Sequence, residues 1–199
     1  MVSTIRLDTV RHYHAALQQT LDRLALDTVA RIADEILATY DRGSDIFVFG
    51  NGGSAATASH MACDLSKNTA IAGQPFLRIR SLTDNSALLT ALANDIGYEA
   101  VFAQQLIQAP VRSDDLVIAI SGSGNSPNVL AGVTAATAVH ARTISITGCG
   151  GGRLTSLVDL ALVVPSDCME IVEDVHLVVN HAVTTAVRAA LQGRVVVAA

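Results

Sequence analysis

The sequence has no tryptophan, and only 4% of its 199 residues are aromatic. The core must therefore be built mainly from Ala, Val, Leu and Ile, in a chain that is 50% hydrophobic. Near-continuous runs of aliphatic residues are typical of parallel strands that helices cover on both faces. The composition favours an α/β protein, and the length favours one domain with one well-buried core.

Basic clusters are also missing. The chain has 13 Lys and Arg residues against 18 Asp and Glu residues, a formal charge of −5, and no run rich in Lys or Arg. Such a chain offers no surface that would neutralise the phosphates of nucleic acid or of anionic lipid. We therefore expect no direct nucleic-acid partner.

Cysteines and long apolar runs are scarce. Cys63, Cys149 and Cys168 are widely spaced and form no CxxC pair, which argues against a disulfide framework and against a thiolate zinc site. Every apolar run is shorter than the ~20 residues of a membrane span, and residues 1–14 lack the apolar segment of a signal peptide. These absences predict a soluble cytoplasmic protein without a membrane partner.

Hydrophobic periodicity divides the chain into alternating helices and strands. Residues 4–40 carry apolar side chains at helical spacing without Pro or Gly, which predicts two helices that bend near residues 26 and 27. The alternation that follows is typical of a doubly wound parallel sheet. The predicted strands are 45–49, 76–81, 116–121, 143–147 and 160–164; the predicted helices are 54–67, 86–93, 99–107, 126–140 and about 170–191, with a short turn at 153–158.

We expect a single domain over residues 1–199. Its N-terminal helical segment would cover residues 1–42, and the α/β core with the C-terminal helix would cover residues 43–199. The last helix has apolar residues on most of its faces, which favours burial, partly against another subunit.

Two predicted strands end in loops rich in glycine and hydroxyl groups, GNGGS at 50–54 and SGSGNS at 121–126. Glycines let a ligand approach the backbone, and helix N-termini attract anions. Either loop alone could be an ordinary strand-to-helix turn. Two of them at the carboxyl edge of one sheet favour a phosphate site. Neither matches GxxxxGK[ST] or the GxGxxG pattern with its downstream acid, so we expect no nucleotide cofactor.

Four segments occur in the order GNGGSAATASHMACDL, ANDIGYEAVF, ISGSGNS and EDVHLVVNH. Together they resemble the landmarks of the sugar isomerase (SIS) family, and specifically its sedoheptulose 7-phosphate isomerase (phosphoheptose isomerase) branch, over nearly the whole chain. The resemblance implies a five-stranded parallel sheet flanked by helices, with N-terminal helices for oligomerisation. It also implies a homo-oligomer, with a tetramer expected.

The resemblance assigns binding roles to residues of both loops and of two other segments. It implies that the loops hold the substrate phosphate, that an asparagine meets a sugar hydroxyl, and that acids meet further hydroxyls. The implied phosphate-binding residues are Ser54, Ser121, Ser123 and Ser126, with Gly52, Gly53 and Gly122 beside them; Asn51 would meet a sugar hydroxyl, and Asn94, Asp95, Glu170 and Glu173 complete the substrate site.

The family also carries a set of four polar or ionisable side chains on two helices, matched here by His60, Asp64, Glu173 and His181. The family has Glu where this chain has Asp64, and Gln where it has Glu173. Relatives use the set for proton transfer, and some of them bind zinc with it. Aldose–ketose exchange needs a base and an acid. We hypothesise that Asp64 is the base and His181 its acid–base partner in enediol chemistry, and that all four residues could hold a divalent ion, zinc above all.

The activity implied is the conversion of sedoheptulose 7-phosphate to D-glycero-D-manno-heptose 7-phosphate. Because two positions of the set are replaced, an isomerase for another sugar phosphate is an alternative. A non-catalytic regulatory SIS protein, of the type that binds the replication initiator, is a second alternative. A lyase or etherase for an amino-sugar phosphate ranks last, because no motif supplies its acid. A single histidine on a helix is more often structural, and we expect this of His176.

Overall fold

The computed structural model describes residues 4–198, with side chains described as far as Arg194. Five strands form one parallel sheet in the order β2-β1-β3-β4-β5. The fold class expected from the sequence, a doubly wound sheet flanked by helices, is confirmed. The strands are β1 (Ile46–Phe49), β2 (Ile79–Ser81), β3 (Leu116–Ser121), β4 (Arg142–Thr147) and β5 (Leu160–Val163).

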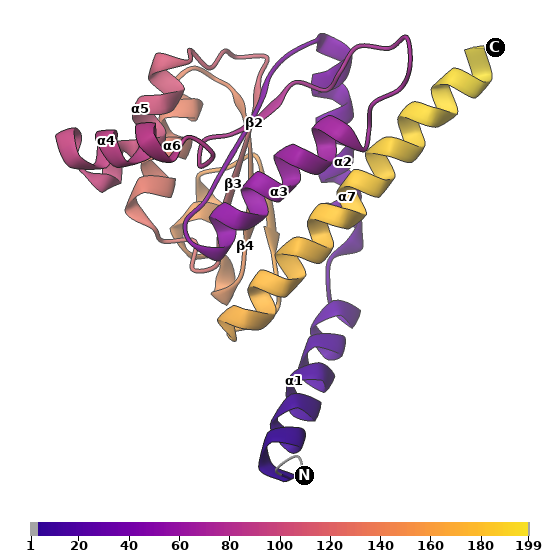
Figure 1. Cartoon of the computed structure of the whole chain (residues 1–199), viewed down its shortest axis with the longest axis vertical. Coiled ribbons are helices and arrows are strands. Elements are labelled where there is room, and N and C mark those ends of the chain that lie inside the picture. Colours follow the sequence, from indigo (N-terminus) through magenta and orange to yellow (C-terminus); the bar gives the residue numbers. More distant parts are fainter. Residues whose placement is uncertain (1–3, 199) are drawn as a thin grey trace.

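Helices cover both faces of the sheet. Helices α2, α3 and α7 lie on one face and α4, α5 and α6 on the other, while α1 projects away from the body beside the start of α7 (Figure 1). The helices are α1 (Thr4–Asp22), α2 (Leu26–Arg42), α3 (Gly53–Lys67), α4 (Ser86–Ile96), α5 (Val101–Gln108), α6 (Pro127–Ala138) and α7 (Met169–Ala198), with 3-10 turns η1 (Tyr98–Ala100) and η2 (Cys149–Ser156).

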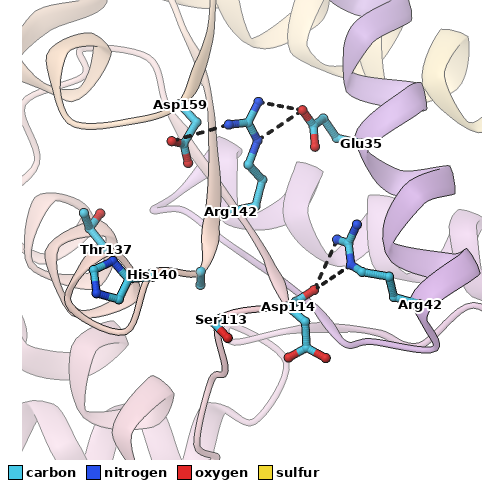
Figure 2. A pocket seen from close by; sticks show the side chains of 9 residues that line it. Glu35, Arg42, Ser113, Asp114, Thr137, His140, Arg142 and Asp159 are labelled. Carbon is cyan, nitrogen blue, oxygen red and sulfur yellow. Dashed lines mark hydrogen bonds and ion pairs between the residues drawn. The ribbon is translucent and has the colours of Figure 1, made fainter.

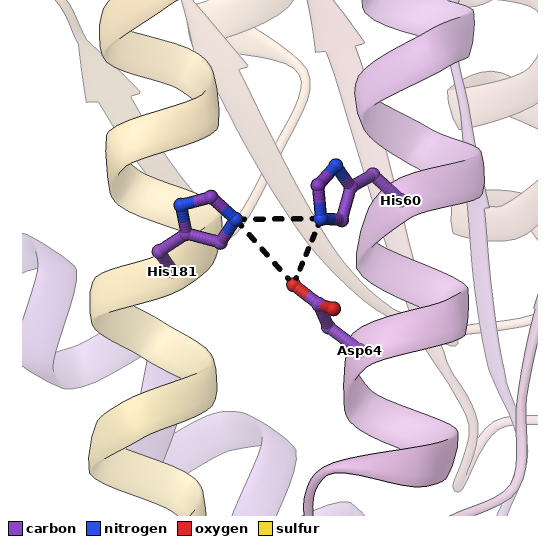
Figure 3. Close-up of side chains that lie close together, drawn as sticks. All are labelled: His60, Asp64 and His181. Carbon is purple, nitrogen blue, oxygen red and sulfur yellow. Dashed lines mark hydrogen bonds and ion pairs between the residues drawn. The ribbon is translucent and has the colours of Figure 1, made fainter.

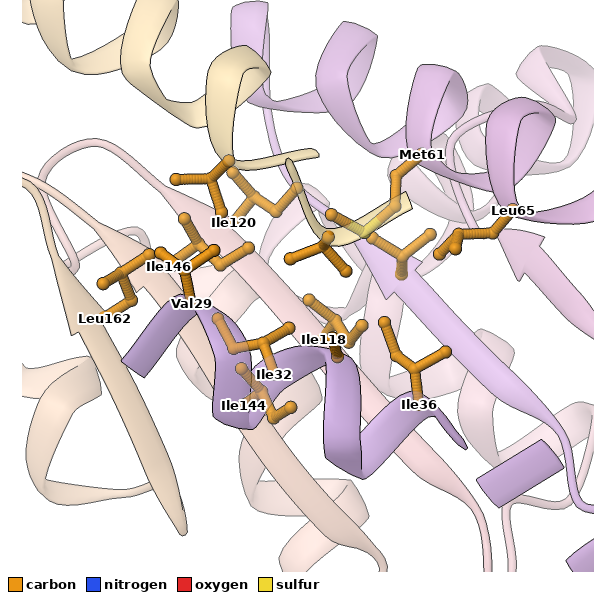
Figure 4. Packing of buried hydrophobic residues seen from close by; sticks show 14 of the residues in the cluster. Val29, Ile32, Ile36, Met61, Leu65, Ile118, Ile120, Ile144, Ile146 and Leu162 are labelled. Carbon is orange, nitrogen blue, oxygen red and sulfur yellow. The ribbon is translucent and has the colours of Figure 1, made fainter. Parts of the chain in front are cut away.

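Alternate residues of the strands enter two separate cores. Figure 4 shows the first, in which isoleucines of β3 and β4 such as Ile118 and Ile144 pack against Ile32 of α2 and Met61 of α3. Residues one position away point to the other face, where Phe49 stacks on Phe102 of α5 with ring centroids 4.7 Å apart. Because each buried aliphatic side chain contributes about 1.5–3 kcal/mol, the two cores hold the sheet and its loops rigidly.

The order of the strands reverses between β1 and β3. From β1 the chain crosses to β2 on one side, and from β3 it crosses to β4 on the other. Connections that diverge in this way leave a crevice at the carboxyl ends of the two strands, where ligands bind in open α/β sheets. Phe49 is paired with Ala119, so the loops at 50–54 and 121–126 begin side by side.

Some element boundaries differ from the prediction. Strand β2 keeps only Ile79–Ser81, because its partner β1 starts at Ile46, opposite Ile79. Helix α4 runs three residues further than expected and takes in Asn94 and Asp95. Helix α7 extends to Ala198. The single domain expected over residues 1–199 stays a prediction, and residues 1–3 and 199 lie outside the described residues.

Across residues 4–198, none of the helices is both long and apolar enough to cross a membrane.

Candidate active site

A pair of asparagines joins the first loop to the start of α6, directly after the second loop. Asn51 donates to Oδ1 of Asn128 at 2.8 Å, and Asn128 donates back to Oδ1 of Asn51 at 2.9 Å. The Tyr98 hydroxyl also donates to Oδ1 of Asn51, at 2.9 Å. Asn51, which the resemblance places on a sugar hydroxyl, thus also holds the loops in register. The sequence alone indicated no role for Asn128 or Tyr98, because both lie far from Asn51 along the chain.

Hydroxyl groups shape the second loop from inside. The Oγ atom of Ser121 accepts the N–H of Gly124, and that of Ser123 accepts the N–H of Asn125, both at 3.2 Å. Ser121 and Ser126 bring their Oγ atoms to 3.5 Å of each other. Several hydroxyls therefore converge where the turn leads into α6, as an anion site requires.

A third glycine loop, which the sequence analysis missed, supports the second one. Residues 148–152 follow β4, and a Cβ atom on Gly124, whose φ is +62°, would overlap the carbonyl oxygen of Gly151. The Asn125 side chain donates to the carbonyl of Ser123 and accepts the N–H of Arg153, both at 3.0 Å. The run GCGGG directly after a predicted strand was the available signal.

Helices α3 and α7 lie side by side and start at these loops (Figures 1 and 3). A Cβ atom on Gly53, the first residue of α3, would overlap the carboxylate of Glu173. One on Gly122 would overlap the sulfur of Met169, the first residue of α7. The beginning of α7 therefore contacts both hydroxyl-rich loops, and Ser54, in the first turn of α3, is buried.

Further along the same helices, two imidazoles and a carboxylate meet (Figure 3). Oδ2 of Asp64 lies 3.2 Å from Nε2 of His60 and 3.6 Å from Nε2 of His181. The two Nε2 atoms are 3.3 Å apart. Asp64 is 13% exposed, whereas His60 and His181 are 44% and 53% exposed, so a ligand can reach the cluster from solvent. The structure thus brings together three of the four residues matched to the family set.

These three side chains fit a zinc ion. Zinc bonds of about 2.0–2.1 Å in a tetrahedron place neighbouring ligand atoms roughly 3.3 Å apart. The observed separations of 3.2, 3.3 and 3.6 Å agree with that value. Imidazole nitrogen and carboxylate oxygen are also donor types that zinc favours.

The fourth residue, Glu173, lies two turns before His181 on α7 with its carboxylate against Gly53. It is not among the three groups whose ligand atoms lie within 4.8 Å of one another in residues 4–198. The amino end of α3 carries a partial positive charge that attracts this carboxylate. Glu173 thus lies at the loop 50–54, and its role as a metal ligand stays a prediction.

The two remaining acids are exposed. Glu170 lies in the first turn of α7, where its own backbone N–H and the thiol of Cys168 lower the pKa of its carboxyl group. Asp95 accepts an amide N–H from Asn94 at 2.8 Å in the last turn of α4. Tyr98, three residues after Asp95, ties this segment to the first loop through Asn51. Their predicted contacts with sugar hydroxyls stay predictions.

His176 lies on α7 between the loops and the cluster, and it is fully buried. Burial lowers its pKa to about 4, because the imidazolium loses its water; the backbone of Thr147 opposes this only weakly. Neither ring nitrogen has a hydrogen-bond partner among the described residues. A neutral, enclosed imidazole agrees with the structural role expected for it.

A cavity of about 560 Å³ opens at the opposite, amino edge of the sheet (Figure 2). Most of its charged groups have a partner within the protein. Arg142 binds Glu35 at 2.6 Å and Asp159 at 3.4 Å, and the guanidinium of Arg42 donates to the carbonyl of Asp114 at 3.2 and 3.3 Å. The bond to Glu35 raises the pKa of Arg142. These charges serve the packing of α2 against the strands.

Fold and site together define an open-sheet α/β protein with hydroxyl-rich loops at the carboxyl edge of its sheet and a cluster of ionisable side chains further along α3 and α7, the helices that contact those loops. The family model described as the SIS domain matches residues 12–148. Curated relatives named phosphoheptose isomerase share 35–39% identity with the chain. The chain belongs to the SIS domain family, in its phosphoheptose isomerase branch, as the resemblance predicted.

Three relatives illustrate the similarity. The probable phosphoheptose isomerase of Thermoplasma acidophilum is 39% identical over 158 residues, which cover 79% of this chain and 86% of that protein. The phosphoheptose isomerase of Pelobacter propionicus is 38% identical over 176 residues, covering 88% and 92%. The solved structure of the Neisseria gonorrhoeae phosphoheptose isomerase aligns with a TM-score of 0.84 at 28% identity, covering 94% of this chain and all of that one.

Proposed function

We propose that the protein is an aldose–ketose isomerase that converts sedoheptulose 7-phosphate to D-glycero-D-manno-heptose 7-phosphate. The observation that carries this proposal is the cluster of Asp64, His60 and His181 on two helices that both start at the hydroxyl-rich loops. The names of the relatives support it independently.

Two proton transfers make up the reaction, and the cluster has a group for each. In the ketose, a base removes a proton from C1. The carbonyl oxygen O2 gains a proton, and the hydroxyl oxygen O1 loses one. Return of the first proton to C2 completes the aldose through an enediol. We assign the transfer of the carbon-bound proton to Asp64 and the proton transfer between O1 and O2 to His181. For this chemistry both groups must lie within hydrogen-bond reach of the substrate.

The spacing along α3 suits a long sugar. From Ser54 to His60 the helix rises roughly 9 Å at 1.5 Å per residue. An extended seven-carbon chain, with its phosphate at one end and its reacting carbons at the other, spans a similar length. In this proposal Ser54, Ser121, Ser123 and Ser126 bind the phosphate, and this fixes the reacting carbons beside Asp64.

His60, Asp64 and His181 would hold a zinc ion, with Glu173 as a candidate fourth ligand. Such an ion would polarise the substrate carbonyl and stabilise negative charge on its oxygen.

We further propose that the enzyme is a cytoplasmic homo-oligomer, a tetramer by family likeness. The projecting helix α1 supports assembly, because Ile5 and Val10 are 78% and 64% exposed on it. Cys63, Cys149 and Cys168 are free thiols, which fits a reducing compartment. Light scattering of the purified protein tests the assembly, and a monomer would contradict it.

The decisive experiment incubates metal-stripped and zinc-loaded protein with sedoheptulose 7-phosphate and with a panel of hexose and pentose phosphates. NMR follows ketose–aldose exchange, and we expect exchange with the heptose. Exchange with another sugar phosphate but not with the heptose would identify that sugar phosphate as the substrate instead. No exchange with any sugar would favour the regulatory alternative, and full turnover in both Asp64→Asn and His181→Ala would refute the residue assignment.

A further inference from the structure

Two asparagines hold the carboxylate of Asp64 from opposite sides. Asn68, which directly follows the last residue of α3, donates its side-chain N–H to Oδ1 at 3.1 Å. Asn180, next to His181 on α7, donates its side-chain N–H to Oδ2, also at 3.1 Å. Each carboxylate oxygen accepts about two hydrogen bonds, so both retain a free lone pair for a proton or an ion.

We infer that Asn180, helped by Asn68, is a positioning residue that fixes the carboxylate of Asp64 between the two imidazoles of Figure 3. This inference rests on the proposed function. Asp64 is shorter by one methylene than the glutamate of the family pattern, so its reach depends on where its helix and its rotamer place it. An amide bond to each oxygen removes the rotational freedom that would let it turn away.

The orientation of the Asn180 amide follows from its partner. If the amide were reversed, Oδ1 of Asn180 would face Oδ2 of Asp64, and two acceptors would meet without a proton between them. The N–H must therefore face the carboxylate, which leaves Oδ1 of Asn180 turned into the protein.

Stability alone does not explain an asparagine at this position. Asn180 is fully buried, and its Oδ1 has no hydrogen-bond partner among the described residues. His176 and Thr184, one turn before and after it on the same face of α7, are also buried with unpartnered polar atoms. An unpaired buried acceptor destabilises the fold, so an apolar residue of similar size would stabilise it. The hydrogen bond to Asp64 therefore explains why this position holds an asparagine.

The test replaces Asn180 by leucine, which has the same number and branching of side-chain heavy atoms but carries no hydrogen-bond donor. We expect kcat with sedoheptulose 7-phosphate to fall about 10–100-fold, the usual effect of losing a residue that orients a reacting or ligating group. KM should hardly change, because the hydroxyl-rich loops are untouched, and circular dichroism should show that the fold persists. The matched control is Thr184→Val, which removes another buried polar group without touching Asp64 and should keep the parent's kcat.

Two outcomes of this comparison would overturn the inference. One is an Asn180→Leu variant with the kcat of the parent. The other is a fall in kcat that comes with a lower melting temperature and appears equally in Thr184→Val, which would indicate a purely structural role. Asn68→Ala, which removes the bond to Oδ1 from a half-buried position, should lower kcat less than Asn180→Leu.

A double-mutant cycle separates this inference from the proposed function. If Asn180 acts through Asp64, Asn180→Leu lowers kcat no further in an Asp64→Asn background; independent, multiplicative losses would contradict it. Full activity of Asp64→Asn alone would refute the proposed base instead. A crystal structure of Asn180→Leu then decides the positioning role without any assay, since the carboxylate of Asp64 should leave its place between His60 and His181, and an unmoved carboxylate would overturn the inference.

Discussion

The amino-edge cavity and the candidate active site both contain charged or ionisable side chains. These groups differ in how far they are paired with one another. At the amino edge, Arg142 pairs with Glu35 and Asp159, and Arg42 donates to the carbonyl of Asp114. On α3 and α7, two half-exposed imidazoles surround one carboxylate, and at the carboxyl edge the Oγ atoms of Ser121 and Ser126 are 3.5 Å apart. Charges that satisfy one another stabilise a fold, whereas groups with free lone pairs and solvent access are able to bind and react.

The largest effect should come from the cluster on α3 and α7. Asp64→Asn keeps the size of the side chain but removes its basicity, and we expect kcat to fall about 10²–10⁴-fold, the range that general acid–base catalysis contributes. Steady-state kinetics with sedoheptulose 7-phosphate measure it, and circular dichroism checks that the fold persists. The matched change at the amino edge is Glu35→Gln. An equal loss of kcat in this variant would contradict the distinction between the amino-edge cavity and the candidate active site.

A buried histidine extends the comparison to the interior. His176 stays neutral in the folded protein down to a pH of about 4, but in the unfolded chain it takes up a proton below about 6.5. The unfolded state therefore binds more protons between these values, so the free energy of unfolding falls as the pH drops from 6.5 to 4, by about 3 kcal/mol in all. Urea unfolding at pH 7 and pH 4.5 should show this loss in the parent and much less of it in His176→Leu.

Equal losses in the parent and in His176→Leu would show that other groups control the acid sensitivity. A matching measurement on His140→Gln serves as the control, because His140 has no part in this buried face and lines the cavity of the amino edge.

The hydroxyl-rich loops should show a smaller effect, and one on substrate binding. Ser126→Ala removes one hydroxyl at the entrance to α6, and a hydrogen bond to a charged group contributes about 1.5–3 kcal/mol. We therefore expect KM for the phosphorylated sugar to rise roughly 10–100-fold with little change in kcat. Ser156→Ala is the control, since that hydroxyl only bonds the carbonyl of Arg153 in η2. A rise in KM in both variants would refute the assignment.

The smallest effect belongs to the amino edge itself. Glu35→Gln weakens the bond to Arg142, and because the two side chains are 25% and 36% exposed, we expect a loss of only about 1 kcal/mol in the free energy of unfolding. Urea denaturation measures it. A large change in KM or kcat would instead indicate that the amino-edge cavity communicates with the carboxyl edge.

Much of the fold followed from local pattern. Residues 116–121 form β3 as predicted, and the helix expected at 54–67 forms one residue earlier, because β-branched runs and helical spacing are local signals. Boundaries failed where a partner decides them, as at β2, whose pairing begins only where β1 begins. The site divides in the same way: His60 and Asp64 share a face by their spacing alone, but no spacing relates either of them to Asn180.

The sequence by itself determined the alternation of strands and helices, the two hydroxyl-rich loops and the family pattern, because each of these is written in neighbouring residues. Only the tertiary structure decided that Asp64 meets His181 and Asn180 from another helix, that Glu173 lies on Gly53, and that a third glycine loop supports the second. Those contacts join residues far apart in the chain, and they depend on how α3 and α7 pack on the sheet, which local patterns do not encode.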